Sequence, residues 1–487
     1  MLSVFNKLIL NSYLLPEFIK SINGLDHFDK SSFLRVHALG EQPVSVHMNA
    51  GKPILVNGNW SSDFTNPAFE LAGKVPWAPD AYYLSQRPSF TLDPLFHAGV
   101  YYVQEASGMF LAFALKQITD LTKKLKVLDL CAAPGGKSTL IQSLISPESL
   151  LVSNEVIKTR VPVLTQNMIK WGKSNGIVSN NDPSHFNQVP GFFDILIIDA
   201  PCSGSGLYRK DPEAAASWTP ELVNLCSQRQ QRILADAWSS LKEGGYLIYS
   251  TCSYSKEENE DILDMHLQQY ACASVALFPD PAWNIVETIS EKAGAFGYRF
   301  YPDKVSGEGF FLAVLQKKQP GQNEDLDNYP SRKSMKNGKA HRSVKNPLRI
   351  SKSAELLIKP WIQFDKLEFI TIGDSIHALN PGLMDDLELL KNNLYLKKAG
   401  IRVGKEGENE WIPDHELALA DFLNKDCPTL SISKSDALLF LRGEPFEAGV
   451  SDKGWHVVSY LDQRLGWVKL LERRMNNYYP KSWRIRQ

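Results

Sequence analysis

Between residues 126 and 250 the chain alternates between short, continuously apolar runs and longer stretches whose apolar residues have helical spacing. The apolar runs lie at 126–130, 150–153, 176–181, 194–198 and 246–250, and the helical stretches at 138–144, 156–171 and 221–241. Strands that are apolar on both faces are typical of parallel sheets with helices on each side. The pattern therefore predicts a doubly wound, Rossmann-like α/β core that ends with the apolar run at 309–315.

The remainder of the 487-residue chain predicts further domains. Hydrophobic residues make up 43% and charged residues 22%, which excludes a disordered chain, a coiled-coil rod and a collagen-like repeat. Apolar residues have helical spacing at 2–22 and alternate at 43–48, whereas 317–349 has no periodicity. We expect a small α+β N-terminal domain at 1–115, the core at 116–316, a basic linker at 317–350 and a C-terminal α+β module at 351–487.

The cysteines and the N-terminal stretch indicate where the protein is located and whether it binds a metal. Six cysteines are scattered without a CxxC pair, which argues against a disulfide framework and against a zinc site. No signal peptide of the usual form is visible, because Lys7, Asn11 and Ser12 interrupt the N-terminal apolar stretch. We expect a cytoplasmic monomer with free thiols, without a metal and without membrane contact.

A small, glycine-containing loop follows the first predicted strand. It comprises Cys131, Ala132, Ala133, Pro134, Gly135, Gly136 and Lys137. A loop of this kind lets a ligand approach the backbone at a helix N-terminus. The Rossmann GxGxxG pattern is absent, and a P-loop would need a glycine where Cys131 stands, so a dinucleotide enzyme and a nucleotide triphosphatase are both disfavoured.

Three acidic residues follow three further predicted strands: Glu155, Asp182 and Asp199. Carboxyl ends of parallel strands meet at one edge of a sheet, and an acidic side chain there can accept hydrogen bonds from ribose hydroxyls. Singly, each carboxylate could be a solvated loop residue or a helix cap. Together they favour a ribose-bearing ligand without a pyrophosphate, and S-adenosylmethionine is such a ligand.

Two cysteines also lie at predicted strand ends, Cys202 in APCSGSG and Cys252 in STCS. A free cysteine is more often a small buried hydrophobe than a nucleophile, and that is our interpretation of Cys226, Cys272 and Cys427. Beside a methyl donor, a thiolate can add to carbon 6 of a pyrimidine and make carbon 5 nucleophilic. Asp199 could stabilise charge at ring nitrogen 3, and a second thiol could assist breakdown of the adduct. The residues alone do not tell which cysteine attacks.

These motifs resemble those of the Nop2/Sun (RsmB/Nop) RNA cytosine-5 methyltransferases, most closely the bacterial members of type F that act on small-subunit ribosomal RNA. The stretches that carry the resemblance are 75–111, VLDLCAAPGGKSTLI (127–141), IIDAPCSGSGLYRKDPEA (197–214), YSTCSYSKEENE (249–260) and YRFYPDKVSGEGFFLA (298–313). The C-terminal stretch GWVKLLERRMNNYYPKSWR is similar to the family's PUA-like RNA-binding module. The resemblance covers residues 1–315 well and implies a class I methyltransferase core.

The resemblance implies a role for each residue of the motifs. Cys252 of the Thr-Cys pair would be the nucleophile, Cys202 of the Pro-Cys pair would assist product release, and Asp199 would contact ring nitrogen 3. The stretch 131–137, with Glu155, Asp182 and Asp199, would bind S-adenosylmethionine. One departure concerns residues 46–50, VHMNA, where relatives often carry Arg and Pro. It puts an RNA contact of the N-terminal region in doubt without affecting catalysis.

The net charge of −1 argues at first sight against a nucleic-acid partner. The charge is unevenly distributed, however. Residues 331–349 hold seven basic residues and no acidic one, and 464–487 hold seven basic residues, one acidic residue and four Trp or Tyr. Phosphates attract Lys and Arg, and unstacked bases pack on aromatic rings. The same aromatic residues could instead form a core, and Arg209 and Lys210 could be either RNA contacts or ordinary surface charges.

Three functions are compatible with these sequence features. The first is S-adenosylmethionine-dependent cytosine-5 methylation of ribosomal RNA, and the second is the same reaction on transfer RNA. The third is a non-catalytic RNA-binding or ribosome-assembly factor that keeps the fold. The joint presence of Cys252, Cys202 and Asp199 argues against the third, because binding alone needs no thiols there.

Overall fold

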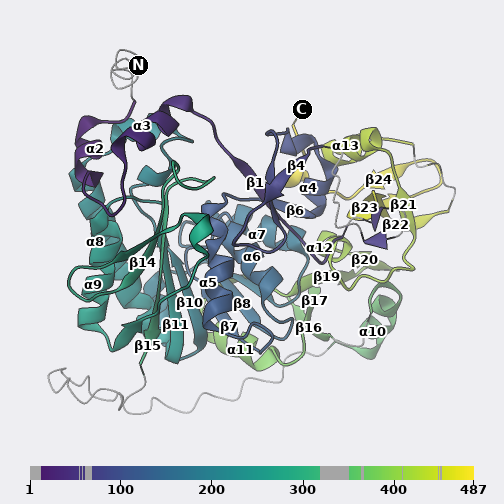
Figure 1. Cartoon of the computed structure of the whole chain (residues 1–487). Helices are drawn as coiled ribbons and strands as arrows, with labels where there is room; N and C mark the ends of the chain where they lie inside the picture. Colours follow the sequence, from purple (N-terminus) through teal and green to yellow (C-terminus); the bar gives the residue numbers. More distant parts are fainter. Residues whose placement is uncertain are drawn as a thin grey trace, which may run out of the picture.

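The computed structural model describes residues 13–53, 55–56, 59–60, 68–318, 350–363, 367–408, 410–447, 449 and 452–486. A large sheet with helices on both faces occupies one side of the molecule, and the C-terminal third lies against its far edge (Figure 1). Two of the sequence predictions, the first part of the helical stretch at 2–22 and the basic segment at 331–349, lie outside the described residues.

Five parallel strands form the centre of the large sheet: β7 (Lys126–Asp129), β8 (Leu150–Asn154), β9 (Gly176–Ser179), β10 (Phe193–Asp199) and β11 (Leu241–Thr251). Their order across the sheet is β9-β8-β7-β10-β11, so the order reverses between β7 and β10. This confirms the predicted doubly wound core. In such sheets ligands bind beyond the carboxyl ends of the strands at the reversal point.

Both faces of the sheet are buried, which explains the continuously apolar strands. In β10, Ile195 and Ile197 pack into one core cluster, and Leu196 and Ile198 pack into the other. The first cluster includes α5 (Phe110–Ile118), α6 (Gly136–Leu144) and α7 (Val161–Trp171), and the second includes α8 (Pro220–Ala237), α9 (Glu260–Gln269) and α11 (Met384–Asn393). Helix α7 begins at Val161, later than the spacing predicted, with a proline in its first turn, where the missing N–H costs no bond.

Antiparallel strands complete the sheet on both sides. Next to β11 lie β15 (Phe310–Lys317), β14 (Phe296–Phe300) and β13 (Val286–Ile289), with β12 (Cys272–Ser274) also paired to β15. At the opposite edge, β18 (Leu396–Ala399) pairs with β9. The C-terminal part of the chain therefore supplies an edge strand to the core sheet, which the predicted division into domains did not include.

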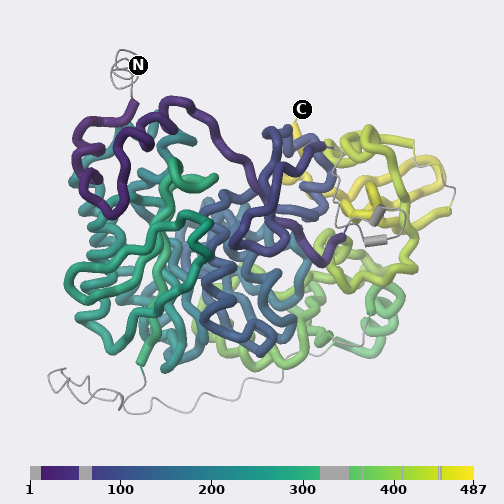
Figure 2. Tube along the Cα trace, viewed as in Figure 1, coloured from purple at the N-terminus to yellow at the C-terminus, as the bar shows by residue number. Residues whose placement is uncertain are grey.

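The N-terminal region forms two separate structures. Helices α2 (Pro16–Ile22) and α3 (Lys30–Leu39) pack against Tyr208, Trp218 and Tyr254 of the core. A four-stranded sheet has the order β4 (Leu71–Lys74), β5 (Ala81–Leu84), β1 (Val44–Met48) and β6 (Tyr101–Val103). Figure 2 shows the chain running between these two structures along one side of the molecule.

The C-terminal third contains two further four-stranded sheets. The first has the order β16 (Glu368–Ile372), β17 (Ser375–Leu379), β19 (Ile401–Glu406) and β20 (Trp411–Pro413). The second has the order β21 (Thr429–Ser431), β22 (Gly454–Tyr460), β23 (Gln463–Leu470) and β24 (Met475–Asn477). Their helices are α10 (Lys352–Ile358), α12 (His415–Leu419) and α13 (Lys434–Arg442). Among the described residues, no helix is both long enough and apolar enough to cross a membrane.

Candidate active site

The sequence motifs meet at the carboxyl ends of the central strands. The stretch 131–137 follows β7, Glu155 follows β8, and Cys202 and Cys252 follow β10 and β11. Strands β10 and β11 pair in parallel with Asp199 beside Ser250, so their loops leave the sheet side by side. The structure thus brings the predicted site residues to the reversal point of the sheet.

The loop after β7 leaves little room for side chains. Gly135 has a φ of +114°, a conformation that L-residues with a side chain rarely adopt, and α6 begins at Gly136. A Cβ atom at Gly136 would lie 3.0 Å from Cε1 of Tyr102. Arg160 donates a hydrogen bond to the Ala133 carbonyl, and Asn167 Nδ2 donates one to the Pro134 carbonyl at 2.9 Å. These contacts fix the backbone at the helix N-terminus, which suits close approach of a ligand.

Asp129 at the end of β7 is fully buried. Its Oδ2 atom accepts a hydrogen bond from Ser138 Oγ at 2.6 Å, and its Oδ1 atom is buried without a partner. Burial raises the pKa of Asp129 to about 7, and the hydrogen bond from Ser138 opposes this shift. This carboxyl group therefore takes up a proton near neutral pH and carries an unused acceptor beside the loop.

Glu155 and Asp182 follow neighbouring strands, as predicted, but they lie in different surroundings. Glu155 is 3% exposed, and its Oε1 accepts a hydrogen bond from the Ile157 amide at 2.8 Å. Asp182 caps the next turn, because its Oδ1 accepts hydrogen bonds from the amide and the hydroxyl of Ser184, which lower its pKa. Of these two acids, Glu155 is buried, whereas Asp182 is partly exposed and caps a turn.

The two cysteine sulfurs touch. The Sγ atoms of Cys202 and Cys252 are 3.1 Å apart, and both residues are partly exposed. The loops are also joined through the backbone, because the Gly206 amide donates a hydrogen bond to the Cys252 carbonyl at 2.8 Å. A Cβ atom at position 206 would lie 2.3 Å from the Gly309 carbonyl oxygen, so only glycine fits this crossing.

The contact between the sulfurs affects their protonation. The hydrogen bond with Cys252 is the largest cause that raises the pKa of Cys202, and burial adds to it. Cys202 therefore keeps its proton and can donate it to the neighbouring sulfur. A thiolate at Cys252 with a thiol at Cys202 is a nucleophile next to a proton carrier.

Asp199 and Lys137 form an ion pair beside the cysteines. Lys137 Nζ lies 2.8 Å from Asp199 Oδ2, and Ser250 Oγ donates a hydrogen bond to Asp199 Oδ1 at 2.8 Å. Burial lowers the pKa of Lys137, but the charge of Asp199 and the hydrogen bond to it, together with the charges of Asp129 and Cys252, outweigh this effect, so the pKa is raised overall. The carboxylate is thereby held in place as a hydrogen-bond acceptor.

Arg209 is a structural residue, which corrects the possibility that it contacts RNA. Its side chain is 4% exposed and its Nε lies 3.1 Å from Glu308 Oε2, while its Nη2 donates a hydrogen bond to the Gly307 carbonyl at 2.7 Å. Its sequence neighbour Lys210 is exposed. The pairing with Glu308 offsets the cost of burying the guanidinium, so Arg209 holds the Cys202 loop against the segment that precedes β15.

Glu258, a residue that the sequence motifs did not identify as functional, lies beneath both cysteine loops. Its side chain is fully buried and accepts hydrogen bonds from Ser203 and Ser253, the residues that follow the two cysteines. The sequence places Glu258 in an acidic run, KEENE, which has the composition of a solvated helix start. No local signal distinguishes it from its exposed neighbour Glu257.

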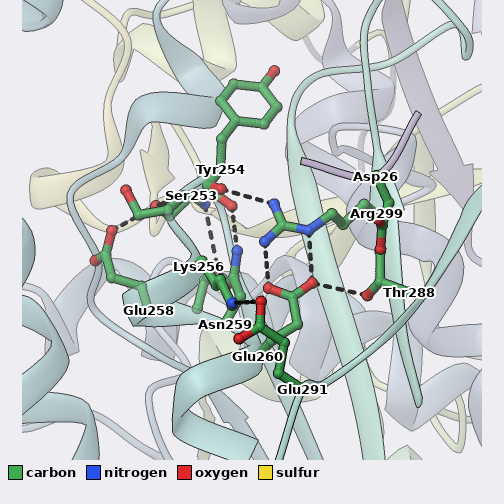
Figure 3. A network of polar contacts seen from close by, with 12 residues as sticks. Asp26, Ser253, Tyr254, Lys256, Glu258, Asn259, Glu260, Thr288, Glu291 and Arg299 are labelled. Atoms are coloured by element: carbon green, nitrogen blue, oxygen red, sulfur yellow. Dashed lines mark hydrogen bonds and ion pairs between the residues drawn. The ribbon is translucent and has the colours of Figure 1, made fainter. Parts of the chain in front are cut away.

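Figure 3 shows how the segment after Cys252 is held. Arg299 Nε donates a hydrogen bond to Glu260 Oε1 at 2.7 Å, and Arg299 Nη1 donates one to the Tyr254 carbonyl at 2.8 Å. Thr288 Oγ1 also donates to Glu260 Oε1, at 2.8 Å. Strand β14 and strand β13 thus fix the start of α9.

The basic and aromatic C-terminal stretch divides into core and surface. Trp467 and Tyr479 are buried, so the interpretation as core residues holds for these two rings. Tyr478 is 41% exposed, and Arg473 and Arg474, before the start of β24, are also exposed. Lys481 and Arg486 of the same stretch are exposed as well, so these exposed side chains are accessible to a nucleic acid.

The N-terminal departure at residues 46–50 has a structural reason. His47 is 1% exposed, and its Nε2 lies 3.3 Å from Thr139 Oγ1 of α6. Burial lowers the pKa of His47 to about 3, so the ring is neutral. This position faces the core and not a ligand.

The described residues hold no cluster of three or more His, Cys, Asp or Glu side chains placed to bind a metal ion.

Comparisons with known proteins cover most of the chain. Residues 116–316 match the family model "16S rRNA methyltransferase RsmB/F". Residues 14–106 match the N-terminal domain of 16S rRNA methyltransferase RsmF, and residues 427–485 match the methyltransferase RsmF PUA domain.

Individual relatives agree with these matches. Ribosomal RNA small subunit methyltransferase F of Vibrio cholerae serotype O1 (strain M66-2) is 29% identical over 422 residues, which cover 84% of this chain and 85% of that protein. The crystal structure of PH0851 is 26% identical, covers 63% of this chain and 66% of that one, and has a TM-score of 0.54. A methyltransferase homolog protein from Pyrococcus horikoshii, also 26% identical, covers 62% of this chain and 100% of that one with a TM-score of 0.50.

Proposed function

Because the chain belongs to the RsmB/F family of methyltransferases, we propose that it transfers a methyl group from S-adenosylmethionine to carbon 5 of a cytosine in small-subunit ribosomal RNA. The observation that carries the proposal is the contact of Cys202 and Cys252, whose Sγ atoms are 3.1 Å apart at the ends of adjacent parallel strands. The names of the relatives support ribosomal RNA as the substrate.

The chemistry requires a nucleophile that activates the ring. The Cys252 thiolate adds to carbon 6 of the cytosine, and the electron pair of the carbon 5–carbon 6 double bond attacks the methyl group. The bond between that methyl group and the donor sulfur breaks, and S-adenosylhomocysteine leaves with its electron pair. A base then removes the proton from carbon 5, and the Cys252 sulfur leaves with the electron pair of its bond to carbon 6, which restores the double bond. The target base must leave its stack, or lie in a loop, for carbon 6 to reach the sulfur.

The two cysteines take different parts in the reaction. Cys202 keeps its proton, since contact with Cys252 and burial both raise its pKa. It can share that proton with Cys252 before attack, and it assists release of the product afterwards. Asp199, fixed by Lys137 and Ser250, accepts a hydrogen bond from the exocyclic amine beside ring nitrogen 3, and from nitrogen 3 itself once that nitrogen has taken up a proton as the thiolate adds.

S-adenosylmethionine supplies the electrophilic methyl group. The backbone of 131–137 receives it at the N-terminus of α6. The Glu155 carboxylate accepts hydrogen bonds from the ribose hydroxyls. Asp182 follows the neighbouring strand β9, and Asp199 ends β10, on the other side of β7. The unused Oδ1 acceptor of Asp129 supports a polar ligand at this position.

The test compares RNA substrates directly. The purified protein is incubated with S-adenosylmethionine and either small-subunit ribosomal RNA or transfer RNA, and bisulfite sequencing locates 5-methylcytosine. We expect one methylated cytosine in the ribosomal RNA and none in the transfer RNA. Methylation of transfer RNA alone would support the second candidate substrate, and a lack of methylation in free RNA and in assembled subunits alike would contradict the proposed activity.

A further inference from the structure

We propose that Glu258 is the positioning residue of the thiol pair: its buried carboxylate joins the loop of Cys202 to the loop of Cys252 and holds the two sulfur atoms in contact. The inference rests on the proposed function, in which both thiols act on one base. It adds to that function a residue that acts indirectly: Glu258 bonds Ser203 and Ser253, the residues that follow the two cysteines.

The carboxylate binds both loops with separate contacts. Oε1 accepts a hydrogen bond from the Ser203 amide at 2.8 Å, and Oε2 accepts one from the Ser203 hydroxyl at 2.6 Å. Oε2 also accepts a hydrogen bond from the Ser253 hydroxyl at 2.5 Å. Because Ser203 follows Cys202 and Ser253 follows Cys252, one side chain fixes the two loops against each other.

Glu258 is itself held from two sides. Gln230 Nε2 of α8 donates a hydrogen bond to Oε1 at 3.2 Å and another to the Pro201 carbonyl at 3.0 Å. The Tyr249 hydroxyl donates a hydrogen bond to the Glu258 carbonyl at 2.7 Å. These contacts fix both the side chain and the backbone of Glu258, so the carboxylate can hold the two loops in place.

The turn after Cys252 is closed by the residue that follows Glu258. Asn259 Oδ1 accepts a hydrogen bond from Thr251 Oγ1 at 2.6 Å, and Asn259 Nδ2 donates one to the Ser253 carbonyl at 2.8 Å. Figure 3 shows Ser253, Glu258 and Asn259 in this arrangement. The backbone on either side of Cys252 is therefore fixed, and Glu258 supplies the connection to the other loop.

The donors to Glu258 are neutral, which is uncommon for a fully buried carboxylate. Within the described parts of the chain, no Lys, Arg or His forms an ion pair with it, although its side chain has no exposed surface. Four hydrogen bonds from neutral donors take the place of the ion pair that a buried carboxylate usually has. Burying a carboxylate in this way is not needed for stability alone. That charge also contributes, after Cys252 and burial, to the raised pKa of Cys202.

The test measures the geometry of the thiols without using methyl transfer. Diamide oxidises two neighbouring thiols to a disulfide and is itself reduced to the hydrazine, and peptide mass spectrometry identifies the Cys202–Cys252 product. We expect Glu258→Ala to slow this disulfide formation by about tenfold or more, because a displacement near 1 Å costs a reaction of oriented groups up to about a hundredfold. Glu258→Gln, which keeps an acceptor for the Ser203 amide, should recover most of the rate.

Glu257→Ala is the matched control, because Glu257 is the exposed neighbour of Glu258 and its variant should react like the wild type. If Glu258→Ala does not fold, the double variant Ser203→Ala, Ser253→Ala removes the hydroxyl contacts and carries the same expectation. An unchanged rate of disulfide formation in whichever of these variants folds would overturn the positioning role.

Kinetics on RNA separate this inference from the proposed function. Glu258→Ala should lower kcat at least tenfold and change KM for RNA less than about twofold, with recovery in Glu258→Gln. If the wild type forms the disulfide with the expected dependence on Glu258 but methylates no RNA, the proposed function fails and the positioning role stands. If the wild type methylates RNA and Glu258→Ala leaves both rates unchanged, the positioning role alone fails.

Discussion

The Sγ atoms of Cys202 and Cys252 lie 3.1 Å apart although the two residues are 50 positions apart in the sequence. The parallel pairing of β10 and β11 with Asp199 beside Ser250 produces this contact, because each cysteine follows its strand at nearly the same distance. Both sulfurs can therefore act on a single bound base.

Asp129 should make the folded protein less stable as the pH rises. Burial raises its folded-state pKa from 3.8 to about 7, so the folded protein binds this proton more tightly than the unfolded chain. The stabilisation is complete at low pH and is lost between about pH 4 and pH 7, with a size on the order of 2–4 kcal/mol.

The variant Asp129→Asn lacks this titration. Urea unfolding from pH 4 to pH 8, without the methyl donor, should therefore show that the variant gains stability relative to the wild type as the pH rises. Parallel curves for the two proteins across this range would contradict the assignment.

Arg209→Ala should destabilise the protein strongly. The substitution leaves the Glu308 carboxylate buried without its partner, and breaking such a pair costs about 3–5 kcal/mol. Lys210→Ala is the control at an exposed position and should change the stability by no more than about 0.5 kcal/mol. Thermal denaturation checks both, and equal melting temperatures for the two variants would show that the buried pair does not stabilise the Cys202 loop.

Arg473 and Arg474 should contribute to RNA affinity without contributing to stability. Both side chains are exposed, and each phosphate contact that is lost lowers the slope of log K against log salt by about 0.7 for single strands. The double alanine variant should therefore bind RNA more weakly, with a slope reduced by about 1.4 if each arginine makes one phosphate contact.

The control for this prediction is a double alanine variant at Lys116 and Lys123, which are exposed on the surface of the domain at 116–316. Filter binding at several salt concentrations measures both slopes. The same loss of affinity in both variants would mean that the C-terminal module does not form a distinct RNA surface.

The core sheet could be predicted from sequence because its signal is local. Each of the central strands contains a continuous apolar run, in β11 only its second half, and the motif residues follow these runs closely. Strand β18 could not be predicted in this way. Lys398 is buried in it and pairs with Glu416, a residue of α12, so its burial depends on a contact that the local sequence does not show.

The same limit applies to the site. The residues Cys202, Cys252 and Asp199 are recognisable because they belong to short motifs at strand ends. The burial of Arg209 depends on Glu308, 99 positions away, and the role of Glu258 depends on Ser203, 55 positions away. Charged residues in loops usually lie on the surface, so only the folded structure identifies these two as buried.

The most direct test of the proposed mechanism is the covalent state of the two cysteine variants with RNA. Each variant is incubated with substrate RNA and S-adenosylmethionine, and denaturing gels detect protein that remains attached to RNA. Cys252→Ala should form no adduct and transfer no methyl group, whereas Cys202→Ala should accumulate a covalent adduct, because attack proceeds and release is slowed. An adduct with Cys252→Ala, or methyl transfer by it at the wild-type rate, would contradict the assignment of Cys252 as the nucleophile.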